Sequence, residues 1–154
     1  MAPPEKIALI ADIHGNLPAL ASVLRDIRHV GCSRLFVLGD IIPGLDPVGC
    51  VELLQSWDHV ECLKGNAEFY LLTPDLQDFP LRHEPFYADL IEHLGWIRAR
   101  LSSAHIDWLH RLPDIIYWNG ACLVHDSPFD RLFPQQRHVP KVDAKYQELF
   151  YHAP

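Results

Sequence analysis

The feature that most constrains this chain is an apolar segment that ends abruptly in polar residues, IALIADIHGN at residues 7–16. Five small or aliphatic residues without helical periodicity, residues 7–11, predict a strand buried on both faces, as in a parallel sheet. Asp12 and His14 follow, before a Gly15-Asn16 turn. Ligands bind at the carboxyl edge of such sheets, and residues two apart in an extended segment project to the same side. A carboxylate beside an imidazole suits a divalent transition metal.

The same pattern then repeats along the chain. A predicted helix over 17–30 ends at Gly31, and an apolar strand at 35–38 leads into Gly39-Asp40. A short helix from Pro47 precedes a third strand at 59–63, which ends in a polar turn containing Asn66. These intervals fit right-handed crossover units of about thirty residues. We therefore expect all three polar turns to lie on one edge of one sheet.

The second half of the chain adds one more polar strand end. Residues 73–85 are predicted to form a surface excursion, and apolar periodicity predicts helices over 87–101 and 106–112. An Asn119-Gly120 turn between apolar runs at 115–118 and 121–124 predicts a hairpin. We expect this hairpin to continue the sheet, so that its second strand delivers His125 to the same edge.

Composition excludes several classes of protein. With 13 Lys and Arg against 20 Asp and Glu, the formal charge is −7, and the chain lacks the basic surface that holds nucleic acid by its phosphates. No apolar run is long enough to span a bilayer, and no signal peptide precedes the first strand, so a cytosolic location is expected. The four cysteines are scattered without a Cys-x-x-Cys pair, which argues against a thiolate zinc site. Residues 1–154 are predicted to form a single domain.

The polar strand ends together form a set of metal ligands. Taken singly, each residue is more simply read as a solvated turn residue, but five at successive strand ends favour a site. A mixed nitrogen and oxygen set without thiolate suits manganese, iron, zinc or nickel better than calcium. Five ligands exceed what one catalytic metal takes from protein, so two metals sharing a bridging hydroxide are predicted, an arrangement suited to in-line displacement at phosphorus. The candidate ligands are Asp12, His14, Asp40, Asn66 and His125.

These motifs, in this order, resemble the calcineurin-like metallophosphoesterase superfamily. Asp12-Ile13-His14, Gly39-Asp40, Gly65-Asn66-Ala67-Glu68 and Val124-His125 are similar to its first four signature blocks, and the flanking residues resemble the small bacterial and archaeal phosphodiesterase-like branch. The resemblance covers about residues 6–128. It implies an α/β fold, the four-layer αββα sandwich. It also implies that Asp12 and His14 hold the first metal, that Asp40 bridges, and that Asn66 and His125 hold the second metal.

The resemblance further implies a function and the residues that serve it. The expected activity is hydrolysis of a phosphomonoester or phosphodiester in a small phosphorylated substrate, with Asp40 and Asn66 as the catalytic residues. Asn66 is expected to contact the substrate phosphate, and Gly15 and Asn16 are predicted to approach it. The identity of the leaving group stays open between a phosphodiester, a nucleotide and a phosphoprotein.

Two departures from the family pattern bear on this expectation. The superfamily normally closes its site with a late Gly-His-x-His block, and this chain has ten histidines but no His-x-His. Because residues 143–151 look like a helix cut short, we expect a domain that is incomplete at its C-terminus. The second departure is Ala67, where many relatives carry a histidine regarded as the general acid.

Other function classes fit the sequence less well. A haloacid-dehalogenase-like phosphatase needs a carboxylate where this chain has His14, and neither a Gly-x-Gly-x-x-Gly turn nor a Gly-x-Ser-x-Gly elbow is present. The main alternative is a truncated or degenerate metallophosphoesterase-like domain with a binding or regulatory role and little turnover. Metal content separates the two, since the enzyme requires two ions per chain.

Overall fold

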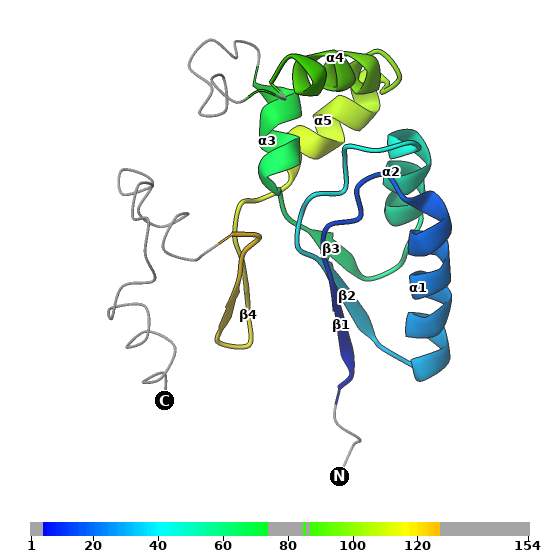
Figure 1. The fold of residues 1–154 in the computed structure, drawn as a ribbon. Coiled ribbons are helices and arrows are strands. Elements are labelled where there is room, and N and C mark those ends of the chain that lie inside the picture. The colour runs from blue at the N-terminus through cyan, green and yellow to red at the C-terminus, as the bar shows by residue number, and fades with distance from the viewer. Residues whose placement is uncertain (1–4, 74–84, 86, 127–154) are drawn as a thin grey trace.

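The computed structural model describes residues 5–73, 85 and 87–126. Most of the predicted surface excursion at 73–85 and the predicted helix at 143–151 lie outside the described residues. The elements follow one another as alternating strands and helices, then three successive helices, then a hairpin (Figure 1). Their bounds are β1 Ile7–Ile10, α1 Leu17–Val30, β2 Arg34–Val37, α2 Pro47–Gln55, β3 Val60–Cys62, α3 Asn66–Leu72, α4 Tyr87–Arg98, α5 Ser103–Arg111, β4 Ile116–Trp118 and β5 Ala121–Leu123.

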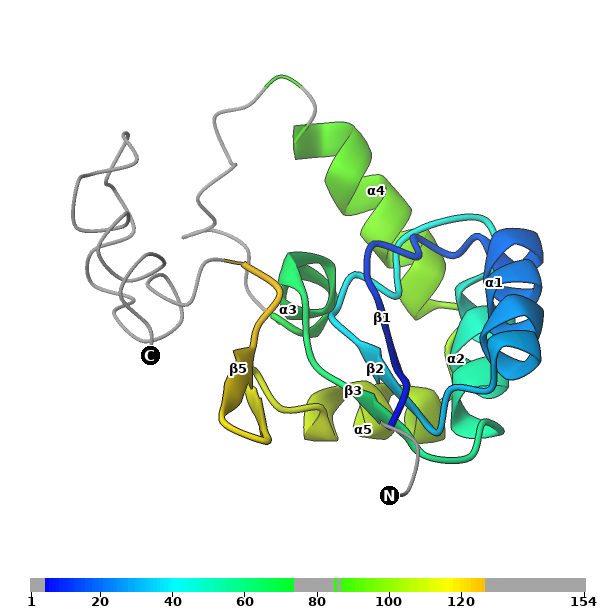
Figure 2. The same cartoon turned by 90° about the horizontal axis from the view of Figure 1, so that it is seen from below.

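The strands form two separate sheets. Strands β1, β2 and β3 pair in that order and in parallel, as the three strand-and-helix cycles predict. Strands β4 and β5 pair only with each other in the described part of the chain, with Tyr117 opposite Cys122. The prediction that the hairpin continues the first sheet is therefore wrong. The hairpin instead lies against one face of the parallel sheet, while α1 and α2 lie on the other side (Figures 1 and 2).

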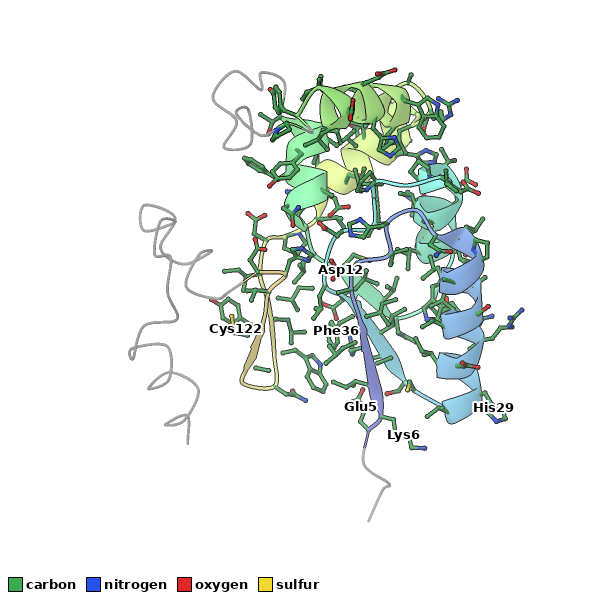
Figure 3. All side chains as sticks on the ribbon, in the orientation of Figure 1. Glu5, Lys6, Asp12, His29, Phe36 and Cys122 are labelled. Carbon is green, nitrogen blue, oxygen red and sulfur yellow. The ribbon has the colours of Figure 1, made fainter. Side chains whose placement is uncertain are left out.

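Strand β2 shows how the two faces are packed. Leu35 and Val37 belong to the core shared with α1 and α2, whereas Phe36 points the opposite way. Phe36 is fully buried against Leu63 and Ile116, and its ring meets Trp118 edge-on with centroids 5.6 Å apart (Figure 3). Because the side chains of a strand alternate between its two faces, β2 packs against α1 and α2 on one face and against the β4–β5 sheet on the other. Three of the four layers of the expected αββα sandwich are thus present in the described residues.

Strand β1 is less buried than its sequence predicts. Within the described residues it pairs only with β2, which makes it an edge strand, and the side chain of Leu9 is 51% exposed. The prediction of burial on both faces is therefore wrong for β1. The central strand β2 is the one with both faces covered, and Leu35, Phe36 and Val37 are all buried. None of the described helices has the length and apolar character needed to cross a membrane.

Candidate metal centre

The loops after β1 and β2 run side by side beyond the ends of the strands. The N–H of Asp12 donates to the carbonyl of Gly39 at 3.2 Å, and the N–H of His14 donates to that of Asp40 at 3.0 Å. Asp12, His14 and Asp40 all have positive φ, at 55°, 46° and 53°. Non-glycine residues rarely adopt this conformation, and when they do the surrounding structure holds them there. The segment after β1 is therefore a set of turns, and the prediction that Asp12 and His14 share one side of an extended strand is wrong.

These turns bring the predicted ligands together around Asp40. Its Oδ2 lies 3.8 Å from Nε2 of His14, which is itself 3.7 Å from Oδ1 of Asp12. Its Oδ1 lies 3.4 Å from Nε2 of His125. One oxygen of Asp40 therefore faces the residues that follow β1, and the other faces the residue that follows β5. Asp12, Asp40 and His125 each place one ligand atom within 4.8 Å of the others, a spacing that a metal ion could span.

The five predicted ligands form one cluster, and in the part made by Asp40, Asn66 and His125 the hydrogen-bond acceptors face one another. Nδ1 of His125 is 2.6 Å from the carbonyl oxygen of Leu38, so in the neutral ring this nitrogen carries the proton and donates it. Nε2 then presents a lone pair, and Oδ1 of Asn66 lies 3.0 Å from it. Together with Oδ1 of Asp40, three acceptor atoms converge. A divalent cation at this position would satisfy all three acceptors. The hydrogen bond that Nδ1 donates to the Leu38 carbonyl is of the kind that orients metal-binding histidines.

Burial divides the cluster into an inner and an outer part. Asp40 and His125 are nearly enclosed, with side chains 5% and 8% exposed, whereas the side chains of Asp12 and His14 are 61% and 49% exposed. Burial raises the pKa of Asp40, and this is opposed by the hydrogen bond from the Ala67 N–H at 2.9 Å and by the nearby histidines. The site is thus open on the side of Asp12, which lies at the end of β1 (Figure 3).

Two glycines permit this close assembly. A Cβ placed on Gly39 would overlap the backbone of Gly65 and lie 2.9 Å from Nδ1 of His125. A Cβ on Gly65 would overlap Asp40 and lie 2.9 Å from its Cγ. A side chain at either position would separate the loop after β2 from the start of α3. The glycines beside Asp40 and Asn66 therefore allow these two residues to come together.

Gly15 and Asn16 have structural roles in the loop after β1. The N–H of Gly15 donates to the carbonyl of Ile41 at 2.9 Å. Oδ1 of Asn16 accepts the N–H of Ala19 at 3.1 Å, which makes Asn16 the N-cap of α1. These bonds fix the path of the loop. Contact of either residue with a substrate phosphate stays a prediction.

Glu68 is a residue to which the sequence alone assigned no role. Its side chain is fully buried, and it accepts three backbone N–H groups, those of Asp40, Ile42 and Gly65. Burial raises the pKa of this carboxyl, and the three hydrogen bonds oppose that effect. An acidic residue at the third position of a helix is the available sequence signal, and it predicts only a contact with the helix N-cap.

Comparison with known proteins agrees with this geometry. Residues 5–147 match the family model described as calcineurin-like phosphoesterase. The chain belongs to this family. It is 34% identical over 173 residues to an uncharacterised protein of Methanocaldococcus jannaschii, an alignment covering 95% of this chain and 68% of that protein. The family is described by its phosphoesterase members.

Two solved structures are similar to the chain. A metallophosphoesterase from Sphaerobacter thermophilus is 28% identical with a TM-score of 0.57, over 75% of this chain and 44% of that one. A candidate diadenosine tetraphosphatase is 22% identical with a TM-score of 0.56, over 83% of this chain and 60% of that one. The second likeness shows the fold alone. The chain spans roughly half of these two solved chains.

Proposed function

We propose that the protein is a metal-dependent phosphoesterase whose site holds two divalent metal ions bridged by Asp40. The observation that carries this proposal is the division of the Asp40 carboxylate. Oδ2 faces His14 at 3.8 Å, and Oδ1 faces His125 at 3.4 Å. A carboxylate whose two oxygens face different ligand groups is suited to bridging two ions. Family membership supports the use of divalent metals.

The donor set defines which metals fit and how the residues would be divided. Asp12 and His14 would hold one ion, and Asn66 and His125 the other, a mixture of carboxylate, imidazole and amide suited to manganese, iron, zinc or nickel. Two such ions supply charge neutralisation at phosphorus and a nucleophile available at neutral pH. Nδ1 of His125 donates to the carbonyl of Leu38, which leaves Nε2 as the ring nitrogen that can serve as ligand. Asn66 would contact the substrate phosphate as well as the second ion.

The charge of the chain indicates how a small phosphorylated substrate would be bound. A formal charge of −7 opposes binding of an anion, so the ions must provide the attraction that a basic pocket would otherwise supply. The open side of the cluster at Asp12 and His14 is the available direction of approach. Both phosphomonoesters and phosphodiesters meet these requirements.

A hydrolysis screen tests the proposal. The full chain, loaded with Mn²⁺, is assayed against an aryl phosphomonoester, an aryl phosphodiester, cyclic nucleotides and diadenosine tetraphosphate. We expect turnover of at least one class, lost in Asp40→Ala and kept in Cys32→Ala, whose partly buried thiol lies outside the cluster. Metal-loaded protein that hydrolyses none of these compounds would instead support the binding domain with little turnover.

A further inference from the structure

Glu68 joins the two loops that carry Asp40 and Asn66. Its Oε2 accepts the N–H of Asp40 at 2.9 Å and that of Gly65 at 2.8 Å, and its Oε1 accepts the N–H of Ile42 at 3.0 Å. Asp40 and Ile42 follow β2, whereas Gly65 precedes α3. One carboxylate therefore ties together two segments that are separated by more than twenty residues in the sequence.

Ordinary helix capping explains only one of these three bonds. An acidic side chain at the third helical position commonly accepts the N–H of the N-cap residue, which here is Gly65. The bonds to Asp40 and Ile42 reach a different loop and contribute nothing to capping α3. One of them holds the backbone N–H of Asp40 itself, and the other holds the N–H of Ile42, two residues further along the same loop.

The backbone of Asp40 needs such support. Its φ of 53° lies in the left-handed region, which a residue with a side chain occupies only when its surroundings hold it there. A second bond, from the Ala67 N–H to Oδ1 of Asp40 at 2.9 Å, orients the carboxylate itself. Both supports come from the first turn of α3, so the position of that turn sets the position of the proposed bridging group.

Glu68 itself is not placed to touch a metal or a substrate. Its side chain has no exposed surface, and both of its oxygens are occupied by backbone donors. We propose that Glu68 is a positioning residue that fixes the backbone of Asp40 and its alignment with Asn66, and so sets the metal affinity of the centre. This inference rests on the proposed two-metal function.

Two substitutions at this position separate positioning from capping. Glu68→Gln keeps the shape but turns an amide N–H₂ toward backbone donors. Glu68→Asp keeps the charge and can still cap α3 at Gly65, but it is one methylene too short to reach Asp40 and Ile42 as well. Ser102→Ala is the matched control, because it removes the side chain that caps α5 away from the metal cluster.

The measurements are titration of the metal-free full chain with Mn²⁺ by calorimetry and the visible absorption spectrum of the Co²⁺ form. We expect both Glu68 variants to bind Mn²⁺ about 10- to 100-fold more weakly, with an altered Co²⁺ spectrum, because residues that support ligands have effects of this size. Ser102→Ala should match the native chain. If Glu68→Gln does not fold, Glu68→Asp alone decides.

The possible outcomes are distinct. Native affinity and spectrum in Glu68→Asp would overturn the positioning role while leaving the two-metal function intact. An equal loss of affinity in Ser102→Ala would assign the effect to general destabilisation and also overturn it. A native chain that binds neither metal would overturn the proposed function, and this inference with it.

Discussion

Replacing Gly65 with alanine tests the packing of the metal centre without removing any proposed ligand. A Cβ at this position would overlap both the backbone nitrogen and Oδ1 of Asp40 and would lie 2.9 Å from its Cγ. Neither atom can move away freely. The nitrogen of Asp40 donates to Glu68, and Oδ1 of Asp40 accepts the N–H of Ala67, so both are held by the first turn of α3. The loop after β2 and the start of α3 must therefore move apart.

The cost in stability can be estimated from the overlap in the folded chain and from the effect of alanine on the unfolded chain. Overpacking of an enclosed site costs about 1–3 kcal/mol. The reduced freedom of alanine in the unfolded chain returns about 0.4–1 kcal/mol. We expect Gly65→Ala to lower the free energy of unfolding by about 1 kcal/mol. For a domain of this size that lowers the melting temperature by about 2–4 °C. Separation of Asp40 from Asn66 should weaken metal binding by at least about tenfold.

Gly95→Ala is the matched control for this experiment. Gly95 lies inside α4, and a Cβ there would meet nothing within 4 Å. Alanine is preferred over glycine in a helix by about 1 kcal/mol, so this variant should be slightly more stable and should bind metal as the native chain does. The assays are urea denaturation of the metal-free chain and Mn²⁺ titration. Gly65→Ala with native stability and native metal affinity would refute the close packing of Gly65 on Asp40.

Three further predictions follow from burial and from the residue at position 67. Burial raises the pKa of Cys62 from 9.0 to about 12, so the folded chain keeps this proton while the unfolded chain loses it, and the free energy of unfolding should fall above pH 9 by up to about 1.4 kcal/mol per pH unit. Urea denaturation should show a steeper fall in the native chain than in Cys62→Ala, where Cys50, whose pKa burial raises to about 11, still contributes, and parallel pH profiles would contradict the prediction. Phe36→Ala should cost about 3–5 kcal/mol because Phe36 is enclosed between the two sheets, whereas Tyr117→Ala, 72% exposed in the native chain, should change stability by less than about 0.5 kcal/mol, and equal effects would contradict the layering. Because alanine at position 67 cannot donate a proton, and general acid catalysis contributes about 100- to 10,000-fold, the enzyme should strongly prefer aryl over alkyl esters, and similar chemical rates for both would show that another group acts as the acid.

The order of elements could be predicted from the sequence because local signals are strong here. The Gly15-Asn16 turn and Gly31 mark the two ends of α1, and the Asn119-Gly120 turn marks the β4–β5 hairpin. Which sheet the hairpin joins could not be predicted. That choice depends on the packing of Phe36 against Ile116 and Trp118, a contact between residues far apart in the chain.

The candidate ligands could be named from the sequence, but their arrangement could not. Strand ends on one edge predicted that Asp12, His14 and Asp40 would gather, and the structure brings them together. His125 joins them although its hairpin belongs to the second sheet. The left-handed turns that achieve this, and the buried carboxylate of Glu68 that supports Asp40, depend on backbone contacts between two loops. Such contacts leave no periodic pattern in a sequence, so the extended segment predicted after β1 was wrong.

The number of divalent ions bound by the native chain tests the central claim most directly. Metal-free protein is titrated with Mn²⁺ by calorimetry, and the metal content of the dialysed complex is measured by elemental analysis, for the native chain and for Asp40→Ala. A bridge shared by two ions predicts two ions per native chain and loss of both in Asp40→Ala. One ion per native chain, or two ions retained in Asp40→Ala, would contradict an Asp40-bridged pair.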